Sequence, residues 1–310
     1  MKSPLLFDAR SMLCVPANIE RFVLKAAERG ADVILLDLED GVAPSAKPQA
    51  RDALAGAIRF LQGRGATVYV RVNHDASLLD ADLSACILGG ADGIVMPKVE
   101  SGEEILQLDA TLSRAERRAG RDPGNTRVIA LIETPTGVCR ATEIAHASPR
   151  LVSMGLGAED YANAMEIEPV EQALAYPAQA VAMAAVAAGL HPIGLAGAVG
   201  DFTDLKAYKK VAEHARTIGV RGAVCIHPAQ VAVLNEAFGG SRAQAEAAER
   251  VVAAFDMAMA EGRGALSLDG KMIDAPIANR ARAFLARYRR YAGRHAGGTA
   301  RTGGSAKEPA

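Results

Sequence analysis

The chain has 310 residues, half of them apolar, and carries 35 basic against 36 acidic side chains. This length and apolar content suffice to bury a large core, and the balanced charge gives no field that would attract polyanions, so nucleic acid is not an expected partner. No apolar run approaches the roughly 18 residues of a membrane span, and the N-terminal apolar stretch is too short for a secretory signal. The four cysteines lie far apart without a C-x-x-C pair, which fits reduced thiols in a cytoplasmic protein.

Short β-branched runs alternate along the chain with stretches of helical periodicity, a pattern typical of βα units around a parallel sheet. The candidate strands are Ser11–Val15, Val33–Leu38, Val68–Asn73, Gly93–Pro97, Val128–Ile132, Leu151–Gly155, Pro192–Ala196 and Ala223–Ile226. Eight parallel strands, each followed by a helix, predict an α/β fold, a closed (β/α)₈ or TIM barrel.

The barrel is expected to occupy residues 1–240, because this fold needs only about 250 residues. Two further helical segments follow, about Arg242–Glu261 and Ile277–Tyr291, separated by the glycine-rich stretch Gly262–Gly270. We therefore predict a C-terminal helical extension over 241–291 that packs on, or is swapped with, a neighbouring subunit. Residues 292–310 are rich in Gly, Ala and charge, which predicts a disordered tail.

Two of the strand-like runs end in a carboxylate, Glu133 after IALI and Asp160 at the end of LVSMGLGAED. If these runs are neighbouring barrel strands, both carboxylates reach the same rim and can hold one hard divalent cation. Asp160, and likewise Asp40 before GVAPSAK, could instead serve only as a helix N-cap. Glu133 has no such structural duty, since Thr136 is the better cap for the helix that follows it.

Charged residues of both signs follow the other strands. Arg71 could meet a substrate carboxylate or thioester oxygen, or equally neutralise Glu39 or Asp40. Lys98 stands where a Schiff-base aldolase would place its lysine, but the nearby carboxylates favour the charged amine, so a structural ion pair is the preferred interpretation. His227 could act as a base or pack below the rim in a turn.

Eight motifs together match a known pattern, in order, over about residues 10–290. They are RSMLCVPAN (Arg10–Asn18), DLEDGVAPSAK (Asp37–Lys47), VRVN (Val70–Asn73), MPKVE (Met96–Glu100), LIET (Leu131–Thr134), GAED (Gly157–Asp160), IHPAQV (Ile226–Val231) and GKMIDAP (Gly270–Pro276). This succession resembles the citrate lyase β-subunit-like (CitE-like) branch of the HpcH/HpaI aldolase superfamily. The resemblance implies a TIM-barrel carbon–carbon lyase that depends on Mg²⁺, with Mn²⁺ as a substitute. It would cleave a 3-hydroxyacyl-CoA thioester of the malyl, citramalyl or citryl type into an acyl-CoA and a 2-keto acid.

The resemblance also implies roles at the metal. Glu133 and Asp160 correspond to the two metal ligands, and Asp37, Glu39 and Asp40 to carboxylates that hold metal-bound waters. A 2-hydroxy carboxylate can chelate Mg²⁺ through two oxygens, which stabilises the alkoxide and then the keto acid.

For the substrate, the resemblance makes Arg71 the arginine that steadies the carbonyl or enolate oxygen, and Arg10, Arg71 and Glu133 the expected substrate contacts. Asp274, in GKMIDAP, corresponds to the acid/base, carried on a C-terminal segment that reaches the active site of an adjacent subunit in related lyases. Cleavage needs such a base on the substrate hydroxyl and a sink for the departing enolate.

A homo-oligomer, trimer or hexamer, is accordingly expected. Three other functions stay open from the sequence. One is the β-subunit of a multi-subunit citrate lyase, whose citryl thioester is carried on an acyl carrier protein. The second is a pyruvate-releasing aldolase acting on free hydroxy-keto acids. The third is a non-catalytic barrel that binds CoA esters or a partner without affinity for Mg²⁺.

Overall fold

The computed structural model describes residues 7–198, 200 and 202–299. Its central feature is an eight-stranded parallel sheet in the order β7-β6-β5-β4-β3-β2-β1-β8. The strands are β1 (Ser11–Pro16), β2 (Val33–Asp37), β3 (Val68–Arg71), β4 (Gly93–Met96), β5 (Arg127–Ile132), β6 (Leu151–Leu156), β7 (His191–Gly194) and β8 (Ala223–Cys225). All eight predicted strands are present, and the predicted TIM barrel is confirmed.

The barrel closes between β7 and the residues just before β8. The Gly194 N–H donates to the Gly222 carbonyl at 2.9 Å, and the Arg221 N–H donates to the Pro192 carbonyl at 2.9 Å. Gly222 also allows β1 to approach, because a Cβ there would lie 1.9 Å from the Ala9 carbonyl oxygen. A side chain at this position would therefore push the first and last strands apart.

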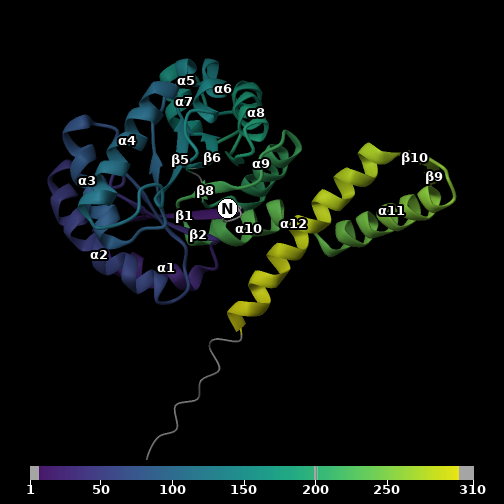
Figure 1. The fold of residues 1–310 in the computed structure, drawn as a ribbon, viewed down its shortest axis with the longest axis horizontal. Helices are drawn as coiled ribbons and strands as arrows, with labels where there is room; N and C mark the ends of the chain where they lie inside the picture. The colour runs from purple at the N-terminus through teal and green to yellow at the C-terminus, as the bar shows by residue number, and fades with distance from the viewer. Residues whose placement is uncertain (1–6, 199, 201, 300–310) are drawn as a thin grey trace, which may run out of the picture. The chain divides into compact units, whose positions relative to one another are not determined.

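Helices surround the strands (Figure 1). They are α1 (Glu20–Ala26), η1 (Ala27–Arg29), η2 (Pro44–Ala46), α2 (Lys47–Gln62), α3 (Ala76–Gly89), α4 (Gly102–Arg118), α5 (Pro135–Cys139), α6 (Ala141–Ala145), α7 (Ala158–Met165), α8 (Glu171–Ala187), α9 (Leu205–Thr217) and α10 (Pro228–Gly239). Side-chain caps mark several starts: Asp75 accepts the Ser77 N–H and Ser101 accepts the Glu104 N–H.

Alternate strand residues face two separate apolar layers, as the two-residue period of a strand requires. On β2, Ile34 and Leu36 pack outward against the helices, whereas Val33 and Leu35 fill the barrel interior. The same alternation brings Asp37, at the end of β2, to the carboxyl-terminal mouth of the barrel.

The chain divides into two compact units between Phe238 and Gly239. The second unit contains α11 (Arg242–Ala260), a two-stranded hairpin of β9 (Leu266–Leu268) and β10 (Lys271–Ile273), and α12 (Ala275–Thr299). Phe255, Ile273 and Ala278 form its small core. The hairpin was not predicted, although its two-residue Asp269-Gly270 turn, with φ of 51° and 75°, has the sequence typical of a type I′ turn.

The last helix runs past the predicted C-terminal boundary. The sequence predicted a disordered tail that starts at Ala292, whereas α12 continues to Thr299, and the rest of the predicted tail, 300–310, lies outside the described residues.

No helix among the described residues is both long and apolar enough to cross a membrane.

Candidate active site at the barrel mouth

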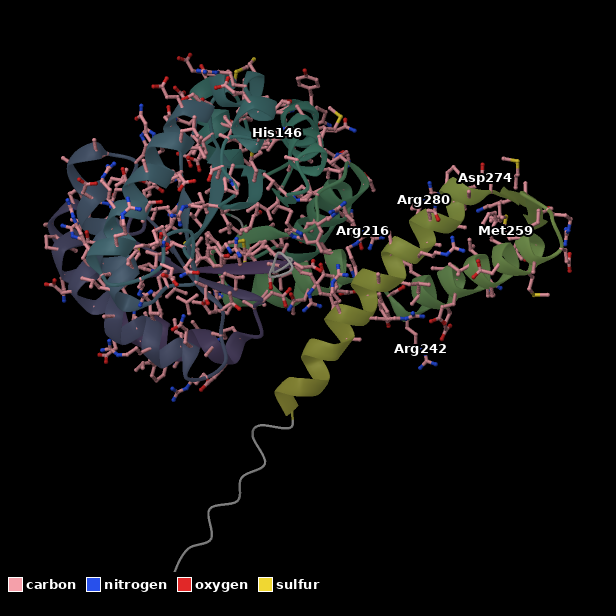
Figure 2. All side chains as sticks on the ribbon, viewed as in Figure 1. His146, Arg216, Arg242, Met259, Asp274 and Arg280 are labelled. Carbon is pink, nitrogen blue, oxygen red and sulfur yellow. The ribbon has the colours of Figure 1, made fainter. Side chains whose placement is uncertain are left out.

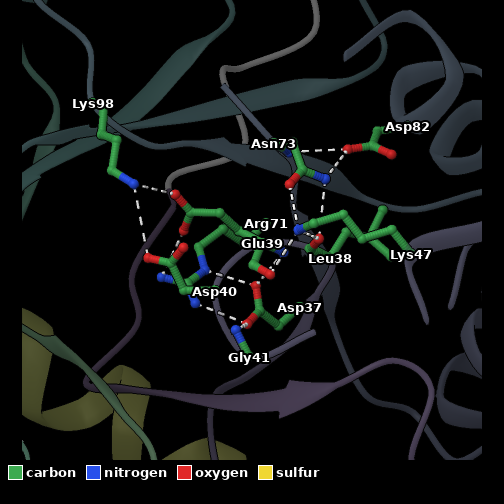
Figure 3. A network of polar contacts seen from close by, with 10 residues as sticks. All are labelled: Asp37, Leu38, Glu39, Asp40, Gly41, Lys47, Arg71, Asn73, Asp82 and Lys98. Atoms are coloured by element: carbon green, nitrogen blue, oxygen red, sulfur yellow. Dashed lines mark hydrogen bonds and ion pairs between the residues drawn. The ribbon is translucent and has the colours of Figure 1, made fainter. Parts of the chain in front are cut away.

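Asp37 and Arg71 form a buried ion pair where β2 and β3 end (Figure 3). The Arg71 Nε and Nη2 groups donate to the two Asp37 oxygens at 2.7 and 2.8 Å, and the N–H groups of Glu39 and Gly41 donate to the same carboxylate at 3.0 and 2.8 Å. Burial alone would raise the pKa of Asp37, but these bonds from Arg71 and the main chain hold it below its usual value. Asp37 therefore fixes Arg71, and its contacts do not show the predicted role of holding metal-bound water.

Glu39 lies between two cations. Its carboxylate is 3.0 Å from Arg71 Nη1 and 3.0 Å from Lys98 Nζ, and it is almost fully buried. Burial raises the pKa of Glu39, while burial of Lys98 is outweighed by this ion pair, which raises the pKa of the amine. The interpretation of Lys98 as an ion-pair partner is confirmed, and Arg71 does neutralise Glu39.

Asp40 is more loosely held. Its side chain is 62% exposed and lies 3.7 Å from Lys98 Nζ. It caps no helix, since the N-caps of η2 and α2 are Ala43 and Ala46.

Lys98 also connects this cluster to Glu133, which directly follows β5. Its backbone has a φ of 55°, a left-handed conformation that is uncommon away from glycine, and its N–H donates to Glu133 Oε2 at 2.9 Å. Such backbone conformations cluster at functional sites, where the surrounding structure holds them in place.

Glu133 is 3% exposed, and its pKa is raised to about 8, first by burial and then by the negative charges of Asp160 and Glu39. The start of α7 passes close above it: a Cβ on Gly157 would lie 2.5 Å from Glu133 Cγ and 2.6 Å from its Oε1. Glycine at position 157 therefore makes room for this carboxylate.

The helix caps near Glu133 differ from those predicted. Thr134, not Thr136, caps α5, with its hydroxyl accepting the Gly137 N–H at 3.2 Å. Asp160 does not cap α7, whose N-cap is Gly157; it lies in the first turn of that helix. The structural alternative for Asp160 is thereby removed.

The donor chemistry at Glu133 and Asp160 fits a hard divalent cation. The nearby cations Arg71 and Lys98 pair with Asp37, Glu39 and Asp40, so that Glu133 receives a main-chain N–H and no ion-pair partner from the described residues. A buried carboxylate beside a second one is costly unless a cation neutralises both. Three or more His, Cys, Asp or Glu residues do not come together as a metal-binding group in the described part of the chain. Two carboxylates, with water and substrate oxygens completing the shell, match the way Mg²⁺ is usually bound.

Arg10 was predicted to contact substrate, but its contacts in the structure lie away from the barrel mouth. It precedes β1 and so lies at the amino-terminal end of the barrel, whereas the mouth is formed by the carboxyl ends of the strands. Its Nε and Nη2 groups donate to Asp32, just before β2, at 2.8 and 2.9 Å, and both side chains are about 5% exposed or less. Arg10 therefore has a structural role at the closed end.

Asp274 belongs to the second unit, at the start of α12 (Figure 2). Its Oδ1 accepts the Ile277 N–H at 3.3 Å, so it caps this helix. His227, at the end of β8, stacks on Phe202 with ring centroids 4.7 Å apart, and its Nδ1 accepts the Ala229 N–H at 3.2 Å.

Residues 10–228 match the family described as HpcH/HpaI aldolase/citrate lyase, which covers more than half of the sequence. The chain belongs to this family. The citrate lyase subunit beta of Escherichia coli K12 is 36% identical over 281 residues, covering 90% of this chain and 92% of that protein. The L-malyl-CoA/beta-methylmalyl-CoA lyase of Rhodobacter capsulatus is 34% identical over 286 residues, covering 86% and 90%.

Solved structures agree. CitE of Mycobacterium tuberculosis, in complex with magnesium, acetoacetate and coenzyme A, superposes with a TM-score of 0.73 at 30% identity, covering 92% of this chain and 99% of that one. As a member of this family, the protein is a carbon–carbon lyase, as its sequence predicted.

Three residues that support the site of this lyase carried no functional prediction. Gly157 is required by the close approach of Glu133. Lys47 binds the Glu39 carbonyl, and Asp82 binds the Asn73 amide beside it. Gly157 and Lys47 lie within the motifs GAED and DLEDGVAPSAK, which was their only signal in the sequence. Asp82 lies outside every motif, and an aspartate in a helix is normally a solvated residue.

Proposed function

We propose that this protein is a Mg²⁺-dependent lyase that cleaves a 3-hydroxyacyl-CoA thioester of the malyl, citramalyl or citryl type into an acyl-CoA and a 2-keto acid. The observation that carries the proposal is the buried carboxylate of Glu133, which lies beside Asp160 at the mouth of a barrel of this family and has no ion-pair partner among the described residues. The magnesium, acetoacetate and coenzyme A bound to the similar CitE structure support the choice of metal and substrate class.

Glu133 and Asp160 would hold the cation, which, when bound, acts as a Lewis acid on the substrate's hydroxyl and carboxylate oxygens. Holding the hydroxy acid there also orients the bond to be broken relative to the rest of the mouth. The thioester half of the substrate would then lie toward Arg71.

Arg71 is suited to stabilising the enolate oxygen. Its guanidinium has five N–H donors, of which Asp37 and Glu39 take three, so two remain for an oxygen of the substrate. Because Asp37 and Glu39 fix the group before substrate arrives, little reorganisation is needed as negative charge develops on the thioester oxygen.

Asp274 would exchange the proton. In the cleavage direction it takes the proton of the substrate hydroxyl and, once the carbon–carbon bond has broken, returns a proton to the enolate carbon to give the acyl-CoA. In the reverse direction it removes a proton from the carbon next to the thioester and gives it to the alkoxide that forms. We propose that it acts in the mouth of a neighbouring subunit of a trimer or hexamer. The second candidate function, the β-subunit of a citrate lyase acting on a carrier-bound citryl thioester, is favoured by the 36% identity to such a subunit.

The test is a coupled assay of the purified protein with malyl-, methylmalyl-, citramalyl- and citryl-CoA, following release of glyoxylate, pyruvate or oxaloacetate, with Mg²⁺ or with EDTA. Citryl thioester on an acyl carrier protein and free 4-hydroxy-2-keto acids serve as the competing substrates. We expect Mg²⁺-dependent turnover of at least one CoA thioester. Turnover of the carrier-bound thioester alone would select the citrate lyase subunit, and turnover of free hydroxy-keto acids alone would contradict the proposal.

A further inference from the structure

Lys47, the first residue of α2, lies behind the turn that carries Glu39 (Figure 3). Its Nζ donates to the carbonyl oxygens of Leu38 and Glu39 at 2.8 and 2.9 Å and to Asn73 Oδ1 at 2.6 Å. An ammonium group has three N–H donors, so each of them has a partner here. The side chain thus binds two successive carbonyls of one turn.

The opposite groups of the same turn are bound by an anion. Asp37 accepts the N–H groups of Glu39 and Gly41, as described above. The turn is therefore held by a carboxylate on its N–H groups and by an ammonium on its carbonyl groups. Both contacts are charge-assisted hydrogen bonds, which are about twice as strong as neutral ones.

Lys47 is itself held in a fixed place. The Asn73 amide nitrogen donates to Leu38 O at 3.0 Å and to Asp82 Oδ2 at 2.7 Å, which turns the amide oxygen toward Lys47. Asp82 is fully buried, accepts the Asn73 main-chain N–H at 2.9 Å and pairs with Arg51 at 3.0 Å. The position of the ammonium group is thus determined by neighbours on α2, on α3 and in the loop that follows β3.

We propose that Lys47 is a positioning residue for the lyase reaction, acting through the turn on Glu39. This rests on the proposed function. The Glu39 carboxylate contacts both Arg71 and Lys98, so a shift of the turn displaces both cations, including Arg71, the residue proposed to stabilise the enolate oxygen. Lys47 does not itself touch the reacting atoms.

A merely structural Lys47 makes a different prediction. Its loss would then lower activity only in proportion to the unfolded fraction, with the turn unchanged in the folded molecules. A positioning role predicts a fall in kcat in fully folded enzyme, together with a more mobile turn. Loss of outer partners of a catalytic group typically costs 10–100-fold.

The experiment compares Lys47→Met, which keeps the apolar stem, with Lys47→Arg, which keeps the charge and several donors. Lys209→Met is the control, because it removes an ion pair with Glu236 on an exposed face of α9. Hydrogen exchange followed by mass spectrometry reports on the peptide over residues 37–43 in the metal-free proteins. Steady-state kinetics give kcat and KM for the active CoA thioester, and calorimetry gives Mg²⁺ affinity.

For Lys47→Met we expect at least tenfold faster exchange in this peptide and a kcat about 10–100-fold lower, with KM and Mg²⁺ affinity within about twofold. Lys47→Arg should recover most of the slow exchange and most of kcat. Lys209→Met should match wild type in exchange and in kinetics. Unchanged exchange, or a kcat loss equal to the unfolded fraction, would overturn the proposal. If wild type cleaves no thioester, the proposed function fails, whereas the exchange result still decides whether Lys47 orders the turn.

Discussion

Buried carboxylates are paired with cations on one side of the barrel mouth but not on the other. On the β2–β4 side, the carboxylates of Asp37 and Glu39 are paired with the cations of Arg71 and Lys98. On the β5–β6 side, Glu133 is equally buried but lies beside a second negative charge, that of Asp160. The ion pairs of the first side hold its cations in place. On the second side, the described residues supply Glu133 with no ion-pair partner.

This contrast explains the pKa directions. Arg71 and the main-chain N–H groups hold the pKa of Asp37 below its usual value, although burial opposes them. Burial and the charge of Asp160 raise the pKa of Glu133 to about 8. Both residues end a barrel strand or follow it directly, so the difference comes from the neighbours and not from the local sequence.

Glu133→Gln should have the largest effect. It removes one of the two charges proposed to bind the metal on the β5–β6 side. We expect kcat/KM to fall by about 1,000-fold or more and Mg²⁺ affinity by at least about 100-fold. Steady-state assays and calorimetric titration measure these changes. Glu143→Gln, which alters an exposed ion pair with Arg140, is the control. Tight Mg²⁺ binding by Glu133→Gln would remove Glu133 from the metal site.

Asp274→Asn separates proton transfer from metal binding. The amide keeps an oxygen for the Ile277 N–H but cannot take a proton, so kcat should fall by about 1,000-fold while Mg²⁺ affinity stays at the wild-type level. Asp269→Asn in the nearby hairpin turn is the matched control. Light scattering should show the same oligomer for both variants. Full activity of Asp274→Asn would transfer the proton-transfer role to another residue.

Arg71→Lys tests the β2–β4 side, where the carboxylates are paired with cations. Lysine keeps the positive charge but loses the two-bond contact with Asp37, so we expect kcat to fall by about 100-fold and stability by about 2 kcal/mol, with little change in Mg²⁺ affinity. Kinetics, urea unfolding and calorimetry give the three quantities. Loss of metal affinity in this variant would show that the two sides of the mouth are not separate in function.

The pH dependence of stability should differ between metal-free wild type and Glu133→Gln. Folding raises the pKa of Glu133 from 4.5 to about 8. The stability gained from protonated Glu133 in the folded protein is therefore fully present below pH 4.5 and is lost as pH rises through about 8. Between pH 6 and pH 8, wild type should lose about 2 kcal/mol relative to the variant. Urea unfolding in EDTA at several pH values measures this, and parallel curves would contradict the raised pKa.

Asp40→Asn should have the smallest effect. Its carboxylate is mostly exposed and 3.7 Å from Lys98, and exposed ion pairs contribute at most about 1 kcal/mol. We expect less than a twofold change in kcat, whereas Glu39→Gln, which alters the buried contact with the same lysine, should cost about tenfold. Equal losses in the two variants would mean that Asp40 has a direct part in the reaction.

Local sequence alone identified the strands and their order. The β-branched runs are long enough to be recognised, and carboxylates at or shortly after the end of a parallel strand lie near the mouth. Glu133 directly follows β5, and Asp160 lies in the first turn of the helix after β6, which is why both could be singled out. Arg10 shows where the same reasoning fails: it precedes its strand, so the rule that places Glu133 at the mouth places Arg10 at the other end.

The sequence by itself determined the barrel and the family, and it singled out Glu133 and Asp160 as the proposed metal ligands, because these depend on periodicity and on the residues near strand ends. Only the tertiary structure decided which charges are paired: Arg71 with Asp37, Lys98 with Glu39, and Lys47 with the carbonyls behind them. Partners separated by 34 and 59 residues leave no local pattern. Their pairing depends on side chains that meet only once the strands have closed into a barrel.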